Sequence, residues 1–176
     1  AVNDLVGKIA LIDRWTCTFE SKVARAQAAG AIGAIIANHL DGDVNPDAVR
    51  DLVARHPSVR AVADVDDLVR EELDVYSPNA LGGALDEVTV DLLRARIVCG
   101  GANNQLVSEG HGGTAERLRE RGITYAPDFL VNAGGVIQVS DELHGFDMER
   151  ARRRTATIFD HTLEVLRSAD AEDVTP

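Results

Sequence analysis

Residues 73–106 read LDVYSPNALGGALDEVTVDLLRARIVCGGANNQL, and their pattern gives the clearest prediction of the fold class. It opens with a short apolar run that ends at Pro78, continues as a helical pattern after Asp86, and closes with the apolar run Ile97 to Cys99. Short apolar runs bounded by Pro and Gly predict buried strands. Two such strands joined by a helix predict parallel pairing.

The same alternation extends in both directions from this stretch. We expect strands at residues 7–13, 33–37, 59–63, 73–77, 97–99 and 123–126. We expect helices at residues 19–29, 45–56, 64–71, 86–93, 114–121, 132–144 and, capped by Asp147, 147–169. This order predicts an α/β fold, with a parallel sheet and helices on both of its faces.

Composition narrows the classes of function. The net charge of −11 over 176 residues argues against nucleic-acid binding, which needs clustered Lys and Arg. Neither a signal peptide nor an apolar run of about 18 residues is evident, so we expect a cytoplasmic protein without a membrane span. The histidines and cysteines lack metal-ligand spacing, so no metal is expected. Cys17 and Cys99 are expected to be free thiols, with one bridge between them as the alternative.

Two candidate binding segments follow the second and fourth predicted strands. Asp43 precedes a helix, where an acidic side chain in a dinucleotide fold accepts hydrogen bonds from the adenosine ribose. The alternative is a solvated loop carboxylate. Residues 77–83, SPNALGG, are small enough to let backbone approach a cofactor closely, although they also suit an ordinary turn.

Two more segments carry amides and an apolar helix face. Residues 100–106, GGANNQL, offer the donors and acceptors of Asn103 and Asn104 to a nicotinamide carboxamide or a substrate carboxylate. The alternative is plain turn chemistry. Val136 and Val139 are spaced i, i+3 on the next predicted helix, where they suit either a branched aliphatic substrate or the core.

Several long motifs in register carry a family resemblance. They are LDVYSPNALGGALDE at 73–87, RIVCGGANNQL at 96–106 and YAPDFLVNAGGVIQVSDELHGFD at 125–147. Together they resemble the glutamate/leucine/phenylalanine/valine dehydrogenases, and are most similar to bacterial valine and leucine dehydrogenases. The resemblance implies a Rossmann-like sheet and NAD-dependent oxidation of a branched-chain L-amino acid to its 2-oxo acid and ammonia. It also implies a possible homo-oligomer.

The resemblance assigns roles to matched positions. Asp43 matches the ribose-binding acid, Ala80 and Leu81 match backbone neighbours of the nicotinamide, and Asn103 and Asn104 match amides that face nicotinamide and substrate. Val136 and Val139 match the pocket for the aliphatic side chain, which Asn104 also borders. Asn79 stands where the family often has Cys, and little effect is expected from that difference.

Two family features are missing from this sequence. The catalytic lysine and aspartate belong to an N-terminal substrate domain that this chain does not contain, so no catalytic residue is assigned. The strand KIALID is followed by RWTCTFE at 14–20 instead of a glycine-rich phosphate loop. We therefore expect a cofactor-binding half, inactive alone, whose sheet is incomplete on its N-terminal side.

The N-terminal segment resembles a different family. Residues 3–38 are similar to part of a protease-associated (PA) domain, a non-catalytic interaction module. This divides the chain into a PA-like strand–helix–strand segment at 1–40 and a dehydrogenase NAD-binding domain at 41–176. The alternatives to an enzyme are therefore an interaction module or an unselected chimera. The N-terminal unit could also take the place of the missing first β–α–β unit of the sheet.

Overall fold

The computed structural model of the 176-residue chain describes most of its length. The described residues are 9–12, 33–36, 46–62, 65–79, 82–108, 112–143 and 145–176. The helix predicted at 19–29, and the candidate residues Asp43, Ala80 and Leu81, lie outside these ranges.

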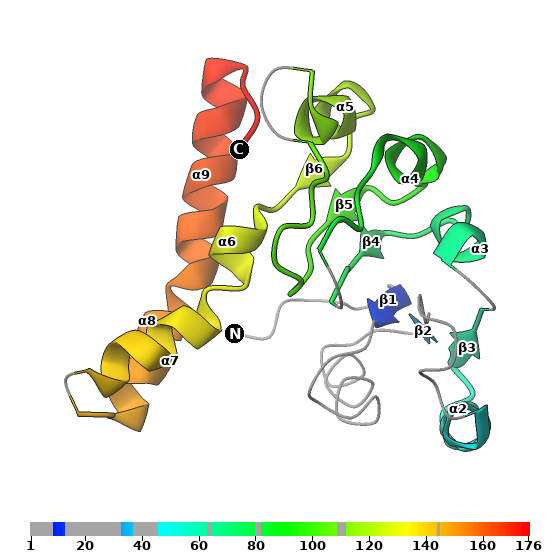
Figure 1. Ribbon diagram of the computed structural model, residues 1–176, viewed down its shortest axis with the longest axis horizontal. Helices are drawn as coiled ribbons and strands as arrows, with labels where there is room; N and C mark the ends of the chain where they lie inside the picture. Colours follow the sequence, from blue (N-terminus) through cyan, green and yellow to red (C-terminus); the bar gives the residue numbers. More distant parts are fainter. Residues whose placement is uncertain are drawn as a thin grey trace.

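Among the described residues, six short parallel strands form the centre of the molecule (Figure 1). One set of three comprises β1 (Ile9–Ile12), β2 (Gly33–Ile36) and β3 (Val59–Ala61). The other comprises β4 (Val75–Tyr76), β5 (Ile97–Val98) and β6 (Thr124–Tyr125). Because β1 lies against β4, the strands follow one another as β3, β2, β1, β4, β5, β6. This is the strand order of a doubly wound Rossmann sheet, and it confirms the predicted α/β fold.

In the described part of the chain, four of the connecting helices that the alternation predicts are present. They are α2 (Pro46–Arg55), α3 (Val65–Val69), α4 (Glu87–Leu92) and α5 (Thr114–Glu120). Beyond β6 come α6 (Asp128–Val131), α7 (Gly134–Glu142), α8 (Met148–Ala156) and α9 (Ile158–Glu172). Helix α5 lies on one side of β6, and α6 and α9 lie on the other, while α7 and α8 form a hairpin that projects from the sheet (Figure 1).

The hydrophobic core fills the space between the second set of strands and helices α3 to α5. Leu85, Leu93 and Leu118 are each fully buried there. The rest of the cluster consists of Leu68, Val69, Leu73, Tyr76, Val90, Ala95, Val98, Ile123 and Tyr125. This core packs against β4, β5 and β6 and so holds their carboxyl ends in place.

The C-terminal helices differ from the sequence prediction. The helix predicted at 132–144 begins at Gly134 and ends at Glu142, and the single turn α6 that precedes it was not predicted. The single final helix predicted from the sequence is two helices, α8 and α9, which meet at Thr157. There the Thr157 hydroxyl donates to the Arg154 carbonyl at 2.8 Å, and such local side-chain bonds compete with helix continuation.

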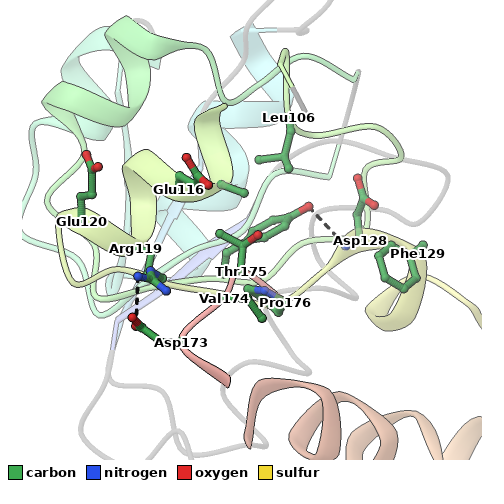
Figure 2. Close-up of a pocket in the computed structure, with 12 residues that line it drawn as sticks. Leu106, Glu116, Arg119, Glu120, Asp128, Phe129, Asp173, Val174, Thr175 and Pro176 are labelled. Atoms are coloured by element: carbon green, nitrogen blue, oxygen red, sulfur yellow. Dashed lines mark hydrogen bonds and ion pairs between the residues drawn. The ribbon is translucent and has the colours of Figure 1, made fainter. Parts of the chain in front are cut away.

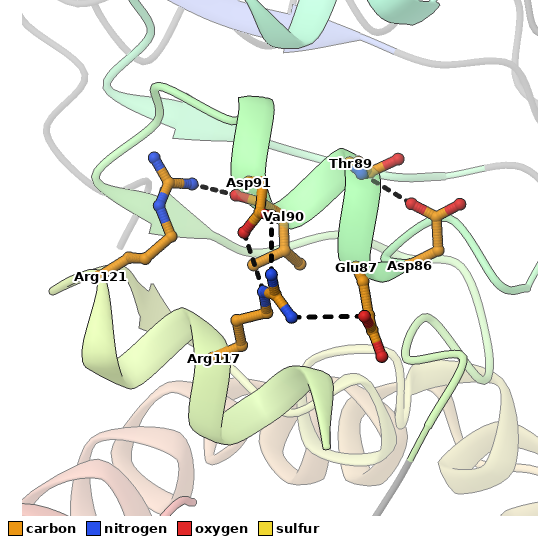
Figure 3. A network of polar contacts seen from close by, with 7 residues as sticks. All are labelled: Asp86, Glu87, Thr89, Val90, Asp91, Arg117 and Arg121. Carbon is orange, nitrogen blue, oxygen red and sulfur yellow. Dashed lines mark hydrogen bonds and ion pairs between the residues drawn. The ribbon is translucent and has the colours of Figure 1, made fainter. Parts of the chain in front are cut away.

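A polar network on the outer surface fastens α5 to α4 (Figure 3). Arg117 donates two hydrogen bonds to the Asp91 carboxylate, at 2.8 and 2.7 Å, and reaches Glu87 at 3.3 Å. The bond from Arg117 holds the pKa of Asp91 below its usual value. Arg121 also donates to the Val90 carbonyl. Because the ion pairs are exposed, we expect them to orient the two helices more than to stabilise them.

The N-cap of α4 gives a first prediction. The Asp86 carboxylate, at the start of the helix predicted at 86–93, accepts a hydrogen bond from the Thr89 backbone amide at 2.6 Å (Figure 3). Asp86→Ala should lower the free energy of unfolding by about 1 kcal/mol in a urea titration, because one helix amide loses its acceptor. Asp86→Asn keeps an acceptor and should retain most of the stability. Equal losses in both variants would contradict the capping role.

Within the part of the chain that the structure describes, no helix combines the length and apolar character needed to cross a membrane.

Candidate functional site

Three segments meet at the carboxyl edge of β4, β5 and β6, where ligands bind in open parallel sheets. Residues 77–79 follow β4, residues 99–106 follow β5, and residues 126–135 follow β6. Parallel pairing of the strands places these three ends on one edge, which we call the amide rim. The rim contains five amide side chains: Asn79, Asn103, Asn104, Gln105 and Asn132.

Glycines allow the first two rim segments to approach closely. A Cβ on Gly100 would lie 2.1 Å from the Pro78 carbonyl oxygen, so only glycine fits at that position. The Ala102 amide donates to the same Pro78 oxygen at 2.9 Å. A Cβ on Gly82 would likewise lie 2.9 Å from the Asn103 carbonyl oxygen. The small residues therefore bring backbone against backbone at this edge.

Asn103 and Asn104 lie at the exposed tip of the second segment. The Asn103 side-chain oxygen accepts a hydrogen bond from the Asn132 side chain at 2.6 Å, which joins the second segment to the third. Asn104 has a left-handed backbone with φ of 52°, and its carbonyl accepts from the Gly83 amide at 2.8 Å. Asn tolerates this conformation better than most residues, and such outliers cluster at functional sites. Both predicted amides are thus brought to one edge and remain accessible.

Gln105 and Asp128 hold this tip from beneath, and sequence reasoning did not identify either of them. The buried Gln105 side chain donates to the carbonyls of Gly100 and Ala102, at 2.8 and 2.9 Å. Its backbone amide donates to the Asp128 carboxylate at 2.7 Å, which ties the tip to α6. The only available signal was that Gln105 directly follows the paired asparagines.

Val136 and Val139 lie on α7, the helix that begins in the third rim segment. Their side chains are 73% and 61% exposed, so the alternative that they belong to the core is wrong. Leu143, at 80% exposure, follows them with helical spacing. The three residues form one accessible apolar stripe on a helix that starts from the third rim segment.

The buried carboxylate of Asp141 holds α7, the helix that carries this stripe, against α8. Asp141 accepts hydrogen bonds from the Arg150 side chain and, at 2.7 Å, from the Asp147 backbone amide. These bonds, that of Arg150 first, hold the pKa of Asp141 below its usual value. Arg150 also donates to the Gly145 carbonyl at 2.7 Å, which closes the turn between α7 and α8. Asp141 thereby fastens α7 to α8.

A cavity of about 780 Å³ lies between α5, β6, α6 and the C-terminal residues, and Figure 2 shows the residues that line it. Asp173 closes one side through an ion pair with Arg119 at 3.0 Å. The Tyr125 hydroxyl, inside the cavity, accepts a hydrogen bond from the Asp128 amide at 3.4 Å. Among the described residues that line this cavity, none is a rim amide or a valine of α7.

Family models match two parts of the chain. The model for glutamate/leucine/phenylalanine/valine dehydrogenase matches residues 33–165. The PA domain model matches residues 1–64, so the two matches share residues 33–64. The PA-like segment therefore overlaps with the region that resembles a dehydrogenase.

Individual proteins show the same likeness. Valine dehydrogenase of Streptomyces albus is 48% identical over 168 residues, which cover 90% of this chain and 45% of that protein. Leucine dehydrogenase of Bacillus cereus is 35% identical over 159 residues, covering 86% of this chain and 42% of that protein. The chain thus spans less than half the length of these curated relatives.

Solved structures agree with the sequence matches. L-tryptophan dehydrogenase from Nostoc punctiforme superposes with a TM-score of 0.84 at 27% identity, over 97% of this chain and 48% of that one. Hetero-hexameric glutamate dehydrogenase from Thermus thermophilus shares the fold, with a TM-score of 0.66 at 19% identity over 98% of this chain and 44% of that one. The chain therefore belongs to the glutamate/leucine/phenylalanine/valine dehydrogenase family.

Proposed function

We propose that this chain is the cofactor-binding part of an NAD-dependent dehydrogenase that oxidatively deaminates a branched-chain L-amino acid to its 2-oxo acid. The observation that carries the proposal is the amide rim, which presents Asn103 and Asn104, together with the accessible valines of α7, the helix that begins in its third segment. The valine and leucine dehydrogenases among the relatives support the class of substrate.

The residues of the rim suit the nicotinamide half of the cofactor. Asn103 and Asn104 offer side-chain donors and acceptors to a carboxamide, which needs both. Ala80 and Leu81 are proposed as backbone neighbours of the same ring, and Asp43 as the acceptor for the adenosine ribose. When bound, NAD supplies the hydride acceptor, and the chain's role is to orient its ring toward the substrate.

Substrate selection is proposed to rest on the apolar stripe and on Asn104. Val136 and Val139 are exposed on α7, where they can contact a branched aliphatic side chain. An apolar pocket separates substrates that differ by one methylene by about 1–3 kcal/mol. Asn104 is proposed to bind the polar end of the same amino acid.

We propose that this chain alone binds cofactor without turnover. The family's catalytic lysine and aspartate belong to a substrate domain, and none of the described residues is a lysine. The proton transfer that the family assigns to that lysine therefore has no lysine to carry it among the described residues of the rim. We further propose a cytoplasmic, homo-oligomeric enzyme, and the free thiol of Cys99 is compatible with a reducing compartment.

A titration with NADH tests the proposal. The chain should quench or shift NADH fluorescence with a dissociation constant in the millimolar range or below. Asn103→Ala should raise that constant about 2- to 10-fold, as expected for the loss of one neutral hydrogen bond. Arg152→Ala, an exposed change on α8 away from the rim, is the matched control and should leave the constant unchanged. A wild-type chain that binds no NADH at millimolar cofactor would overturn the proposed function.

A second candidate function is a non-catalytic interaction module, favoured by the PA match at residues 1–64. This function predicts an oxidising environment and a bridge between Cys17 and Cys99. Burial raises the pKa of the Cys99 thiol, and the structure gives it as a free cysteine. Counting reactive thiols on the denatured, unreduced chain distinguishes the two functions, because two thiols support the enzyme and none supports the module.

A further inference from the structure

Asn79 connects the end of β4 to the amide rim through three hydrogen bonds. Its side-chain nitrogen donates to the Ser77 carbonyl at 2.7 Å and to the Ser77 hydroxyl at 2.8 Å. Its side-chain oxygen accepts from the Gly101 backbone amide at 2.9 Å. One partly buried amide therefore joins two segments that lie 22 residues apart in sequence.

Gly101 is shaped for this contact. A Cβ at that position would lie 2.9 Å from the Asn79 side-chain oxygen and 3.8 Å from the side-chain oxygen of Asn132. Asn132 in turn donates to Asn103. Hydrogen bonds therefore join Ser77, Asn79 and Gly101 on one side of this turn and Asn132 and Asn103 on the other.

We propose that Asn79 is a positioning residue that holds the Gly100–Asn104 turn against the end of β4, and so fixes the place of the two amides that receive the nicotinamide. This inference rests on the proposed function. It contradicts the expectation that asparagine at this position has little effect. A cysteine there could not donate two hydrogen bonds and would accept only weakly from Gly101.

The inference predicts different effects on the binding of the two halves of the cofactor. The hydrogen bonds described above join Asn79 to the segments that end β4 and β5, where the nicotinamide is proposed to lie. The adenosine half is assigned to the other end of the strand order, near Asp43. Loss of Asn79 should therefore weaken binding of NADH while leaving binding of ADP-ribose, which lacks the nicotinamide, unchanged.

The test uses Asn79→Ala, with Asn79→Asp as a variant that keeps an acceptor, and Arg152→Ala as the control. Amide hydrogen exchange at Gly101 should be faster in Asn79→Ala than in wild type. In Asn79→Asp it should be slower than in Asn79→Ala, because a carboxylate can accept a hydrogen bond from the same N–H. In Asn79→Ala the dissociation constant for NADH should rise about 2- to 10-fold, and that for ADP-ribose should stay within error.

Each of the other outcomes of this test would overturn one step of the inference. Unchanged exchange at Gly101 in Asn79→Ala would show that Asn79 does not hold the turn. Faster exchange with unchanged NADH affinity, or equal weakening of NADH and ADP-ribose, would show a structural residue without a positioning role. Wild-type chain that binds neither ligand would refute the proposed function, a failure visible before any variant is compared.

Discussion

Gly100→Ala is expected to lower the free energy of unfolding by about 3 kcal/mol, the upper end of the usual range for overpacking. The added Cβ would lie 2.1 Å from the carbonyl oxygen and 2.6 Å from the nitrogen of Pro78, and both are backbone atoms that cannot rotate away. Relief requires the end of β4 to move from the end of β5. Urea denaturation measures the loss, and NADH affinity should fall with it because the rim opens.

Gly135→Ala provides the matched control for this change. Gly135 lies in α7, and no described atom outside its own helix and its chain neighbours comes within 4 Å of a Cβ built there. Alanine should raise stability at that position by up to about 1 kcal/mol through helix propensity. If Gly100→Ala proved as stable as wild type, the close approach of the two rim segments would be wrong.

The regular elements of the sheet could be predicted because their signals are local. Alternating apolar runs predict the strands, Asp86 and Asp147 cap the helices that follow them, and Gly122 ends α5 in a left-handed conformation with φ of 69°. The Asp147 cap was right even though the helix that it starts is shorter than predicted. Local chemistry fixes where helices begin more reliably than how far they run.

The rim could be predicted only in part. Glycine and asparagine after a strand indicate a binding edge, and the structure does bring Asn103 and Asn104 to it. The contributions of Gln105 and Asn79 depend on partners that belong to other segments, or on burial created by the fold. The spacing of apolar residues along the sequence gives no information about such contacts. The exposure of Val136 was also undetermined, because spacing on a helix does not tell which face meets the core.

The place of the N-terminal strands in the sheet follows from the structure and not from the family that their sequence resembles. Residues 9–12 and 33–36 resemble a PA domain in sequence, yet β1 lies against β4 and extends the order of the dehydrogenase strands. The family match also begins at residue 33, before the proposed boundary at residue 40. A parallel strand–helix–strand unit has one favoured hand, so units of different ancestry can occupy the same place in a sheet.

Gln105→Leu is expected to destabilise the chain by about 2 to 3 kcal/mol, although leucine has nearly the same volume. The buried carbonyls of Gly100 and Ala102 would each lose the donor that Gln105 provides, and an unsatisfied buried acceptor costs about 1–3 kcal/mol. Among the described residues, the Gln105 side-chain oxygen has no hydrogen-bond partner, so its removal offsets a fraction of that cost. The net loss should therefore fall below the sum for two acceptors.

Gln138→Leu is the control for this prediction, because Gln138 is an exposed residue of α7 that only donates to Glu142 at 3.3 Å. Its stability should stay within about 0.5 kcal/mol of wild type. Amide exchange should locate the damage of Gln105→Leu at Ala102 and at the residues of the Asn103–Asn104 tip. If Gln105→Leu were instead as stable as wild type, the two carbonyls would have found other donors, and the tip would be held by Asp128 and the asparagine side chains alone.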